Sequence, residues 1–212
     1  LFCYGLGASV VSRWWLGVRV VCLYANVTVD SLVVAGGGGS ARQAWESGGG
    51  GAGGFLTATG FAVAATALTV TIGAGGIGNA TGGSPYTGTN GSNSVFSTIT
   101  AIGGGAGGKY YESGEDGGSG GGCGGHTTDG SDVGGSATAG QGNDGGTNVN
   151  TGSRDGGSGG GGAGSIGGAN SGINAGAGGA GLQSSISGSS VYYCAGIHMA
   201  SCRSTPQGSS GG

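Results

Sequence analysis

Four stretches of the chain alternate apolar residues with polar or small ones, at the period of two that is typical of a β-strand. The clearest is Phe55–Ile72, in which Gly60 predicts a turn or bulge and therefore two short strands. The others are Asn26–Ala35, Ser94–Ile102 and Leu182–Tyr193, the last of which predicts a closing strand. Asn26–Ala35 and Ser94–Ile102 run directly into glycine, so strands account for only a small part of the sequence.

Between the strands the sequence is dominated by glycine, which makes up 62 of the 212 residues. It comes in runs such as GGGG, GGAGG and GGSGGGG from about Ala35 to Gly181, with small or polar residues between them. An α-helix is disfavoured by about 1 kcal/mol for each glycine relative to alanine, and an ordinary sheet would lack side chains to pack. We therefore expect essentially no α-helix in the glycine-rich part.

The ordered state that suits such a sequence is the polyproline-II helix, which has about three residues per turn and no internal hydrogen bonds. Its N–H and C=O groups point outward and need partners on neighbouring segments. Because glycine has no Cβ, neighbouring backbones can approach and bond one another. The fold class predicted is mostly irregular and β, with short strands beside a sandwich of glycine-rich polyproline-II helices. Collagen is excluded, since there are only two prolines and the glycines keep no three-residue register.

The composition changes along the chain and predicts three regions. Residues 1–26 hold Trp14 and Trp15 but no glycine run, and we expect an N-terminal arm of unassigned structure there. Residues 27–193 form the expected glycine-rich domain with β-segments. Residues 194–212 are a C-terminal tail without a usable pattern.

Charge and hydropathy exclude two classes of partner. Only 7% of the residues are charged, the net charge is −3 and there is no basic stripe, so we expect no nucleic-acid binding. No run of 18 apolar residues occurs, so we expect no membrane insertion. Local bridges could join Cys3 to Cys22 or Cys194 to Cys202, but five cysteines without an evident framework favour free thiols.

Two inserts between the glycine runs combine aromatic side chains with polar ones, as recognition surfaces often do. We assign candidate receptor-binding residues in both, because loops on a rigid scaffold carry function. They are Arg42 and Trp45 in the first insert, and Tyr110, Tyr111 and Glu112 in the second insert, Lys109–Asp116. The alternative is that these side chains simply cover the glycine lattice or the sheet.

No metal or cofactor is expected. The stretch Gln141–Asn148 is similar to a calcium-binding repeat, but glycine replaces the aliphatic residue that the repeat needs. Cys123 and His126 have C-x-x-H spacing without a second such pair nearby. The remaining oxygen ligands to consider are better explained as solubilising charges on loops: Glu115, Asp116, Asp129 and Asp132.

The sequence also favours a protein without catalytic activity. Its only histidines, His126 and His198, lie in no recognisable catalytic context, and there is no G-x-S-x-G motif. Strings that match G-x-G-x-x-G carry no information against this much glycine.

Five motifs in order resemble the glycine-rich domain of tailed-phage virion proteins, over roughly residues 27–193. They are VVAGGGGS at Val33–Ser40, ESGGGGAGGFLTATG at Glu46–Gly60, LTVTIGAGGIG at Leu68–Gly78, NSVFSTITAIGGGAGG at Asn93–Gly108 and GAGGAGLQSSISGSSVYY at Gly176–Tyr193.

The resemblance implies a structural virion protein, often a tail fibre or its tip. In adhesins of the T-even type, a glycine-rich polyproline-II sandwich is a rigid mount whose variable loops contact the host surface. The partners implied are a host cell-surface protein or glycan and other virion subunits, in a homo-oligomer or fibre. The location implied is the virion or the extracellular space.

An alternative is an extracellular filament or cell-surface matrix protein, assembled by stacking of glycine helices. An ice-binding protein would need a flat face of small residues repeating every three positions, which the irregular register does not favour.

Overall fold

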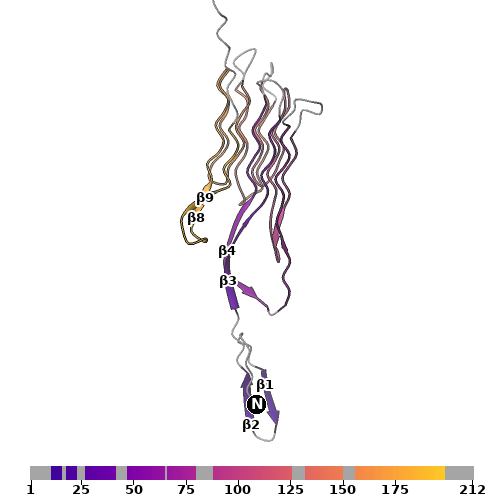
Figure 1. Ribbon diagram of the computed structural model, residues 1–212, viewed down its shortest axis with the longest axis vertical. Coiled ribbons are helices and arrows are strands. Elements are labelled where there is room, and N and C mark those ends of the chain that lie inside the picture. Colours follow the sequence, from indigo (N-terminus) through magenta and orange to yellow (C-terminus); the bar gives the residue numbers. More distant parts are fainter. Residues whose placement is uncertain are drawn as a thin grey trace, which may run out of the picture. The chain divides into compact units, whose positions relative to one another are not determined.

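The computed structural model describes residues 11–15, 18–22, 27–41, 47–64, 66–79, 88–125, 132–149 and 156–198, the first two ranges as backbone alone. These residues contain short strands and no helix, as the sequence predicted (Figure 1). Among them no helix is long and apolar enough to cross a membrane. The chain divides into two units: Leu1–Leu32 with Thr57–Leu68, and Val33–Leu56 with Thr69–Gly212. The domain boundaries expected at residues 27 and 193 stay predictions.

The strands pair only in small sheets. They are β1 (Val11–Trp15), β2 (Val18–Cys22), β3 (Val27–Val34), β4 (Phe55–Val63), β5 (Val70–Thr71), β6 (Ser94–Phe96), β7 (Ile99–Ala101), β8 (Leu182–Ser184) and β9 (Val191–Tyr193). The pairs β1–β2 and β8–β9 are antiparallel, β3 pairs with β4, and β5, β6 and β7 form an antiparallel sheet in that order.

Two of the expected strands are hairpins instead. Ser94–Ile102 contains β6 and β7, joined by a turn at which Ser97 has a φ of 55°. Leu182–Tyr193 contains β8 and β9, and Gly188 between them has a φ of 93°. Two strands do lie in Phe55–Ile72, but they are separated beyond Val63 and not at Gly60. Gly60 stays within β4 at a φ of 65°, where its N–H donates to the Asp30 carboxylate at 2.9 Å.

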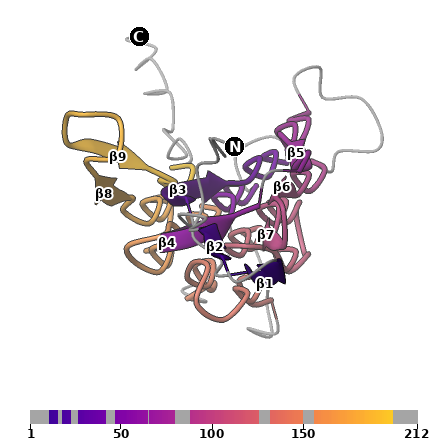
Figure 2. The same ribbon diagram turned by 90° about the horizontal axis from the view of Figure 1, so that it is seen from below.

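In the second unit the glycine segments lie side by side (Figure 1), and Figure 2, which looks along them, shows them as small coils. Their hydrogen bonds repeat every third residue. The N–H of Gly36 donates to the Ser92 carbonyl at 3.1 Å, and that of Gly39 donates to the Thr89 carbonyl at 2.9 Å. Because every third group faces the same neighbour, each segment has three residues per turn, which is the polyproline-II helix that the glycine content predicted.

Segment 118–124 shows how completely this lattice uses the backbone. Every N–H from Gly118 to Gly124 donates to a carbonyl of another part of the lattice. From residue 119 onward the acceptors cycle through three neighbours: Ala52 and Gly49 for Ser119 and Gly122, Asn143 and Gly146 for Gly120 and Cys123, and Glu115 and Glu112 for Gly121 and Gly124. All seven residues are buried, so the interior of this unit is made of peptide groups.

Glycine is required here for space and not for its conformational freedom. A Cβ added to Gly121 would lie 1.9 Å from the Ala106 carbonyl oxygen, and one added to Gly105 would lie 1.9 Å from that of Glu115. Both glycines have a φ that other residues adopt easily. Only a backbone without a side chain allows carbonyl and N–H groups to meet at this separation.

Side chains contribute little to the core. The largest fully buried side chains among the described residues are those of Cys123, Ser119 and Ser158. One apolar cluster lies where the strands join the lattice, and it consists of buried Val33, Ala35 and Ala101 with partly buried Leu56, Phe96 and Ile99 packed against them. Hydrophobic burial therefore secures one end of the lattice, while backbone hydrogen bonds extend through the rest of it.

Polar side chains bond to backbone groups that no glycine helix reaches. Asn90 and Asn93, three residues apart, accept hydrogen bonds from the N–H groups of Ala106 at 2.7 Å and Gly103 at 2.9 Å. Other side-chain oxygens that accept from a backbone N–H belong to Gln141, Asp144, Asp116, Asn170, Ser94, Thr89 and Ser165. Most of these residues cap the lattice at its surface, while Ser94 and Asn170 are buried and bond to the backbone inside it.

Candidate recognition site at the insert end

Neighbouring segments of the lattice run in opposite directions, so the connections between them lie at its two ends. We call one of them the insert end. Gly39, Gly48, Gly108 and Gly124 lie there at the same level. This follows from three hydrogen bonds, in which the Gly107 N–H donates to the Gly39 carbonyl, the Gly48 N–H to the Gly108 carbonyl and the Gly124 N–H to the Glu112 carbonyl. The other, the hairpin end, holds the β6–β7 and β8–β9 hairpins and the turn Thr138–Gln141.

At the insert end a tight turn joins two lattice segments. The Glu112 N–H donates to the Lys109 carbonyl at 2.9 Å, and the Lys109 ammonium lies 2.8 Å from a Glu112 carboxylate oxygen. Tyr111 in this turn has a φ of 59°, a region that residues with a Cβ rarely adopt. Such strain is often found at functional sites.

The two tyrosines of this turn hold each other in place. Their ring centroids are 4.0 Å apart with an interplanar angle of 64°, and the Tyr110 hydroxyl donates to the Tyr111 hydroxyl oxygen at 3.1 Å. Tyr111 is nevertheless 47% exposed. The turn therefore presents a preorganised aromatic pair, which suits recognition because little side-chain entropy is left to lose on binding.

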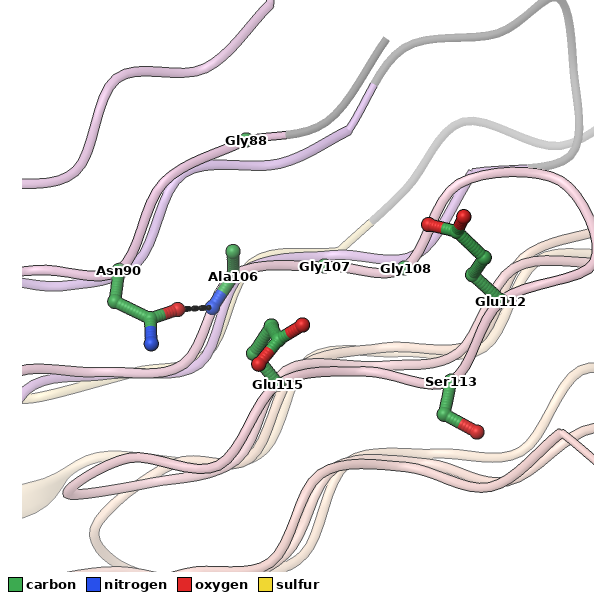
Figure 3. Close-up of a pocket in the computed structure, with 8 residues that line it drawn as sticks. All are labelled: Gly88, Asn90, Ala106, Gly107, Gly108, Glu112, Ser113 and Glu115. Atoms are coloured by element: carbon green, nitrogen blue, oxygen red, sulfur yellow. Dashed lines mark hydrogen bonds between the residues drawn. The ribbon is translucent and has the colours of Figure 1, made fainter. Parts of the chain in front are cut away.

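Beside this turn lies a cavity of about 240 Å³ (Figure 3). Its lining consists of Gly88, Asn90, Ala106, Gly107, Gly108, Glu112, Ser113 and Glu115. Figure 3 shows the Asn90 amide reaching the Ala106 backbone, with the Glu115 side chain directed toward the same segment. The cavity thus combines two carboxylates and an amide, while the Ser113 side chain is directed away from the Gly107–Gly108 backbone and its hydroxyl accepts from the Val133 N–H at 3.2 Å.

Sequence reasoning found the tyrosines and Glu112 but missed Asn90 and Ser113, and it took Glu115 for a solubilising charge. In the sequence Asn90 is followed by Gly91 and Ser92, which indicates a turn and matches an N-x-S/T pattern but does not point to a binding site. It comes near Glu115 because both of their segments flank Ala106, through the bond from Asn90 and the bond Glu115 N–H to Ala106. No local pattern in the sequence encodes that register.

Four segments outside the described residues, 42–46, 80–87, 126–131 and 150–155, are flanked by described residues that lie at this same end. Gly39 and Gly48 are level with the turn, and they are close in the chain to Ala41 and Ser47, between which the first insert lies. The described residues next to 80–87, 126–131 and 150–155 also lie there. The bonds that show this are Asn79 N–H to the Ser40 carbonyl, Gly124 N–H to the Glu112 carbonyl and Ser158 N–H to the Cys123 carbonyl. Arg42 and Trp45 themselves lie outside the described residues, as do His126 and Asp129.

The second insert is shorter than expected. Only Lys109–Tyr111 leaves the lattice, because the Glu112 carbonyl accepts from the Gly124 N–H, and the Gly114 and Glu115 N–H groups donate to Val133 and Ala106. The sequence suggested an insert up to Asp116, since charged residues are normally assigned to loops. Here their backbones are part of the lattice while their side chains lie at its surface.

Two interpretations of the acidic residues need correction. Asp116 is a cap whose carboxylate accepts from the Ser136 N–H, and Asp132 is buried, so neither is merely a solubilising charge on a loop. In Gln141–Asn148, the side chains of Gln141, Asn143 and Asp144 are all bonded to the backbone. The described residues contain no group of three or more potential His, Cys, Asp or Glu metal ligands.

The described thiols are free. Cys123 is buried and donates to the Ser158 hydroxyl at 3.5 Å, and burial raises the pKa of its thiol to about 11. Cys194 is a free cysteine as well, and burial raises its pKa to about 11. Free thiols are confirmed for these two residues, while Cys3 and Cys202 lie outside the described part of the chain.

The geometry agrees with what comparison with known proteins shows. The family model described as a glycine-rich domain matches residues 20–212, so the chain belongs to this family of glycine-rich domains. No curated protein and no solved structure matches the chain.

Proposed function

We propose that this protein is a structural, non-enzymatic protein of a phage virion, of the tail-fibre type, that presents loops for attachment to a host surface. One observation carries the proposal. The tyrosine turn and the described residues that flank 42–46, 80–87, 126–131 and 150–155 lie at the same end of a lattice held by backbone hydrogen bonds. A stiff mount holds the tyrosine turn and the described residues beside it in fixed relative positions, which favours binding because little order has to be created.

The proposed partners are a protein or glycan of the bacterial surface and other subunits of the virion. Tyr110, Tyr111 and Glu112 are the described residues to which we assign contact with the receptor, and Arg42 and Trp45 are proposed to join them. Several copies on one fibre would add avidity, so each single contact can be weak.

The experiment compares binding of the labelled protein to a panel of bacterial strains before and after changes at each end. Tyr110→Ala with Tyr111→Asn removes both rings, and asparagine tolerates the positive φ at residue 111. The matched control is Tyr192→Ala, which removes a 67% exposed tyrosine from β9 at the hairpin end.

We expect the double variant to lose about tenfold or more in binding to the recognised strain, as loss of an aromatic anchor does. The control should stay within about twofold of the wild type. Failure to bind any strain of a broad panel, or an equal loss in both variants, would refute the attachment role.

A further inference from the structure

Segment 72–79 lies at an edge of the lattice, with one side against its neighbours and Gly75 and Gly78 exposed on the other. On the inner side, the Gly76 and Asn79 N–H groups donate to Gly37 and Ser40, and the carbonyls of Ala74 and Ile77 accept from Ser92 and Thr89. The backbones of Gly75 and Gly78 make no hydrogen bond with the described chain. The N–H groups of Gly37 and Ser40 beside them likewise have no acceptor among the described residues. The spacing is three residues in both segments, as it is inside the lattice.

Gly75 and Gly78 have room for a side chain, as Gly37 also does, whereas an added Cβ would come within about 3.2 Å of a neighbouring atom at the other glycines of the lattice. A Cβ at Gly75 would meet nothing closer than 3.8 Å, and one at Gly78 nothing closer than 3.5 Å, which are ordinary contact distances. Both residues are exposed and neither has a positive φ. Alanine at such sites stabilises a chain because it restricts the unfolded state, so folding of a single molecule does not explain glycine there.

The side chains on this edge are also out of place for a solvated surface. Ile72 is 87% exposed and Ile77 is 75% exposed. Together they add apolar area to an edge at which the Gly75 and Gly78 backbones make no hydrogen bond with the described chain. An edge with unpaired backbone groups is a template for another chain.

We propose that this edge, segment 72–79, is a self-association site at which the same segment of a second copy of the chain docks antiparallel about a two-fold axis. Such a contact is isologous: Gly75 of one copy lies against Gly78 of the other, and the reverse. A second copy fits because the edge carries both donors and acceptors and because only a glycine backbone can approach it closely. The inference does not depend on the proposed attachment function.

The antiparallel pairing already exists within the molecule. Ser92 N–H donates to Ala74 at 2.8 Å and Thr89 N–H donates to Ile77 at 3.0 Å, so two segments of opposite direction bond with a three-residue repeat. The docked copy would continue this lattice across the two-fold axis. A contact that pairs the same edge on both molecules closes at two copies.

The edge is short, which sets the strength expected. Eight residues at a rise of ~3.1 Å form a strip about 25 Å long. A strip that is one segment wide buries less area than the roughly 1,200–2,000 Å² of a stable interface. We expect a weak dimer, populated at roughly 0.1–1 mM protein.

Sedimentation of the full chain over this concentration range tests the site. The test variant is Gly75→Ala with Gly78→Ala, which fits the folded monomer but places two methyl groups in the groove that the second copy must enter. The control variant is Gly188→Asn in the β8–β9 turn, where nothing lies within 4 Å of an added Cβ and asparagine tolerates the positive φ of 93°. Circular dichroism checks that both variants are folded.

We expect the wild type and the control to form dimers and the double alanine variant to stay monomeric, with its dissociation constant raised at least about tenfold. Amide exchange in segment 72–79 of the wild type should slow as its concentration rises. A wild type that is monomeric throughout, a variant that dimerises equally well, or growth beyond dimers would each overturn the proposal. The tyrosine variants leave this edge unchanged, so a failure of self-association is distinguishable from a failure of host binding.

Discussion

A single methyl group in the middle of the lattice should destabilise the protein severely. The change is Gly121→Ala, whose Cβ would lie 1.9 Å from the Ala106 carbonyl oxygen. Ordinary contacts begin near 3.4 Å, so the two segments must separate by about 1.5 Å (3.4 − 1.9). Since the φ of Gly121 suits any residue, the added volume is the only source of the effect.

The magnitude follows from the hydrogen bonds that cannot survive this displacement. They are Gly121 N–H to Glu115 at 2.9 Å, Glu115 N–H to Ala106 at 2.9 Å and Gly135 N–H to Gly121 at 2.8 Å. A buried group left without a partner costs about 1–3 kcal/mol, which gives about 3–9 kcal/mol for three. The methyl group and the stiffer unfolded chain return about 1–2 kcal/mol. The net loss is therefore about 1–8 kcal/mol, against a typical stability of about 5–15 kcal/mol.

Urea unfolding followed by circular dichroism, at a protein concentration too low for self-association, measures this loss. The matched control is Gly75→Ala, the same chemical change where the Cβ has 3.8 Å of space. We expect the control to be neutral or stabilised by up to about 1 kcal/mol. A Gly121→Ala variant within about 0.5 kcal/mol of the wild type would refute the argument that close backbone approach is why glycine is needed.

Two further changes test the caps and the buried thiols. Asn143→Asp removes an amide that donates to the Gly162 carbonyl at 2.8 Å and the Ala163 carbonyl at 2.9 Å, and the new carboxylate can only accept. We expect a loss of about 1–3 kcal/mol in the free energy of unfolding. An Asn143→Asp variant as stable as the wild type would contradict the role of these two hydrogen bonds. Burial raises the pKa of Cys123 from 9.0 to about 11, so its contribution to stability is complete below pH 9 and is lost as the pH rises from 9 to 11. The urea midpoint should therefore fall over that range, and less so in Cys123→Ala; an identical fall in both proteins would assign it to other groups.

The sequence was sufficient to predict the kind of fold. Alternation of apolar and polar residues located β3 within one residue of its start and end, and the excess of glycine predicted polyproline-II helices. It failed where two short strands share one pattern: the turn at Ser97 has neither glycine nor proline to mark it, and the break at Gly188 was not recognised as a turn between two strands.

The neighbours of each glycine segment could not be predicted. Segment 118–124 bonds to Ala52 and to Gly146, which lie far from it in the chain on either side. Runs of glycine are interchangeable, because no side chain distinguishes one groove from another. The caps carry part of the missing information, since Asn90 and Asn93 fit only where the Ala106 and Gly103 N–H groups are otherwise unbonded.

The same reason limited the prediction of the candidate site. Adjacent aromatic residues in an insert were enough to single out Tyr110 and Tyr111, and the structure places them in an exposed, strained turn. The cavity beside them needs Asn90 and Glu115, which come together only through lattice register. Residue-level assignment of that cavity therefore had to await the structure.

The central claim is that a lattice of backbone hydrogen bonds, and not a side-chain core, holds the second unit together. Amide hydrogen exchange over segment 118–124 of the monomer tests it most directly. Every N–H in that segment is bonded and buried, so we predict exchange slowed to the rate of global unfolding. Exchange there as fast as in an unfolded glycine chain, in a sample shown to be folded and monomeric, would contradict the account.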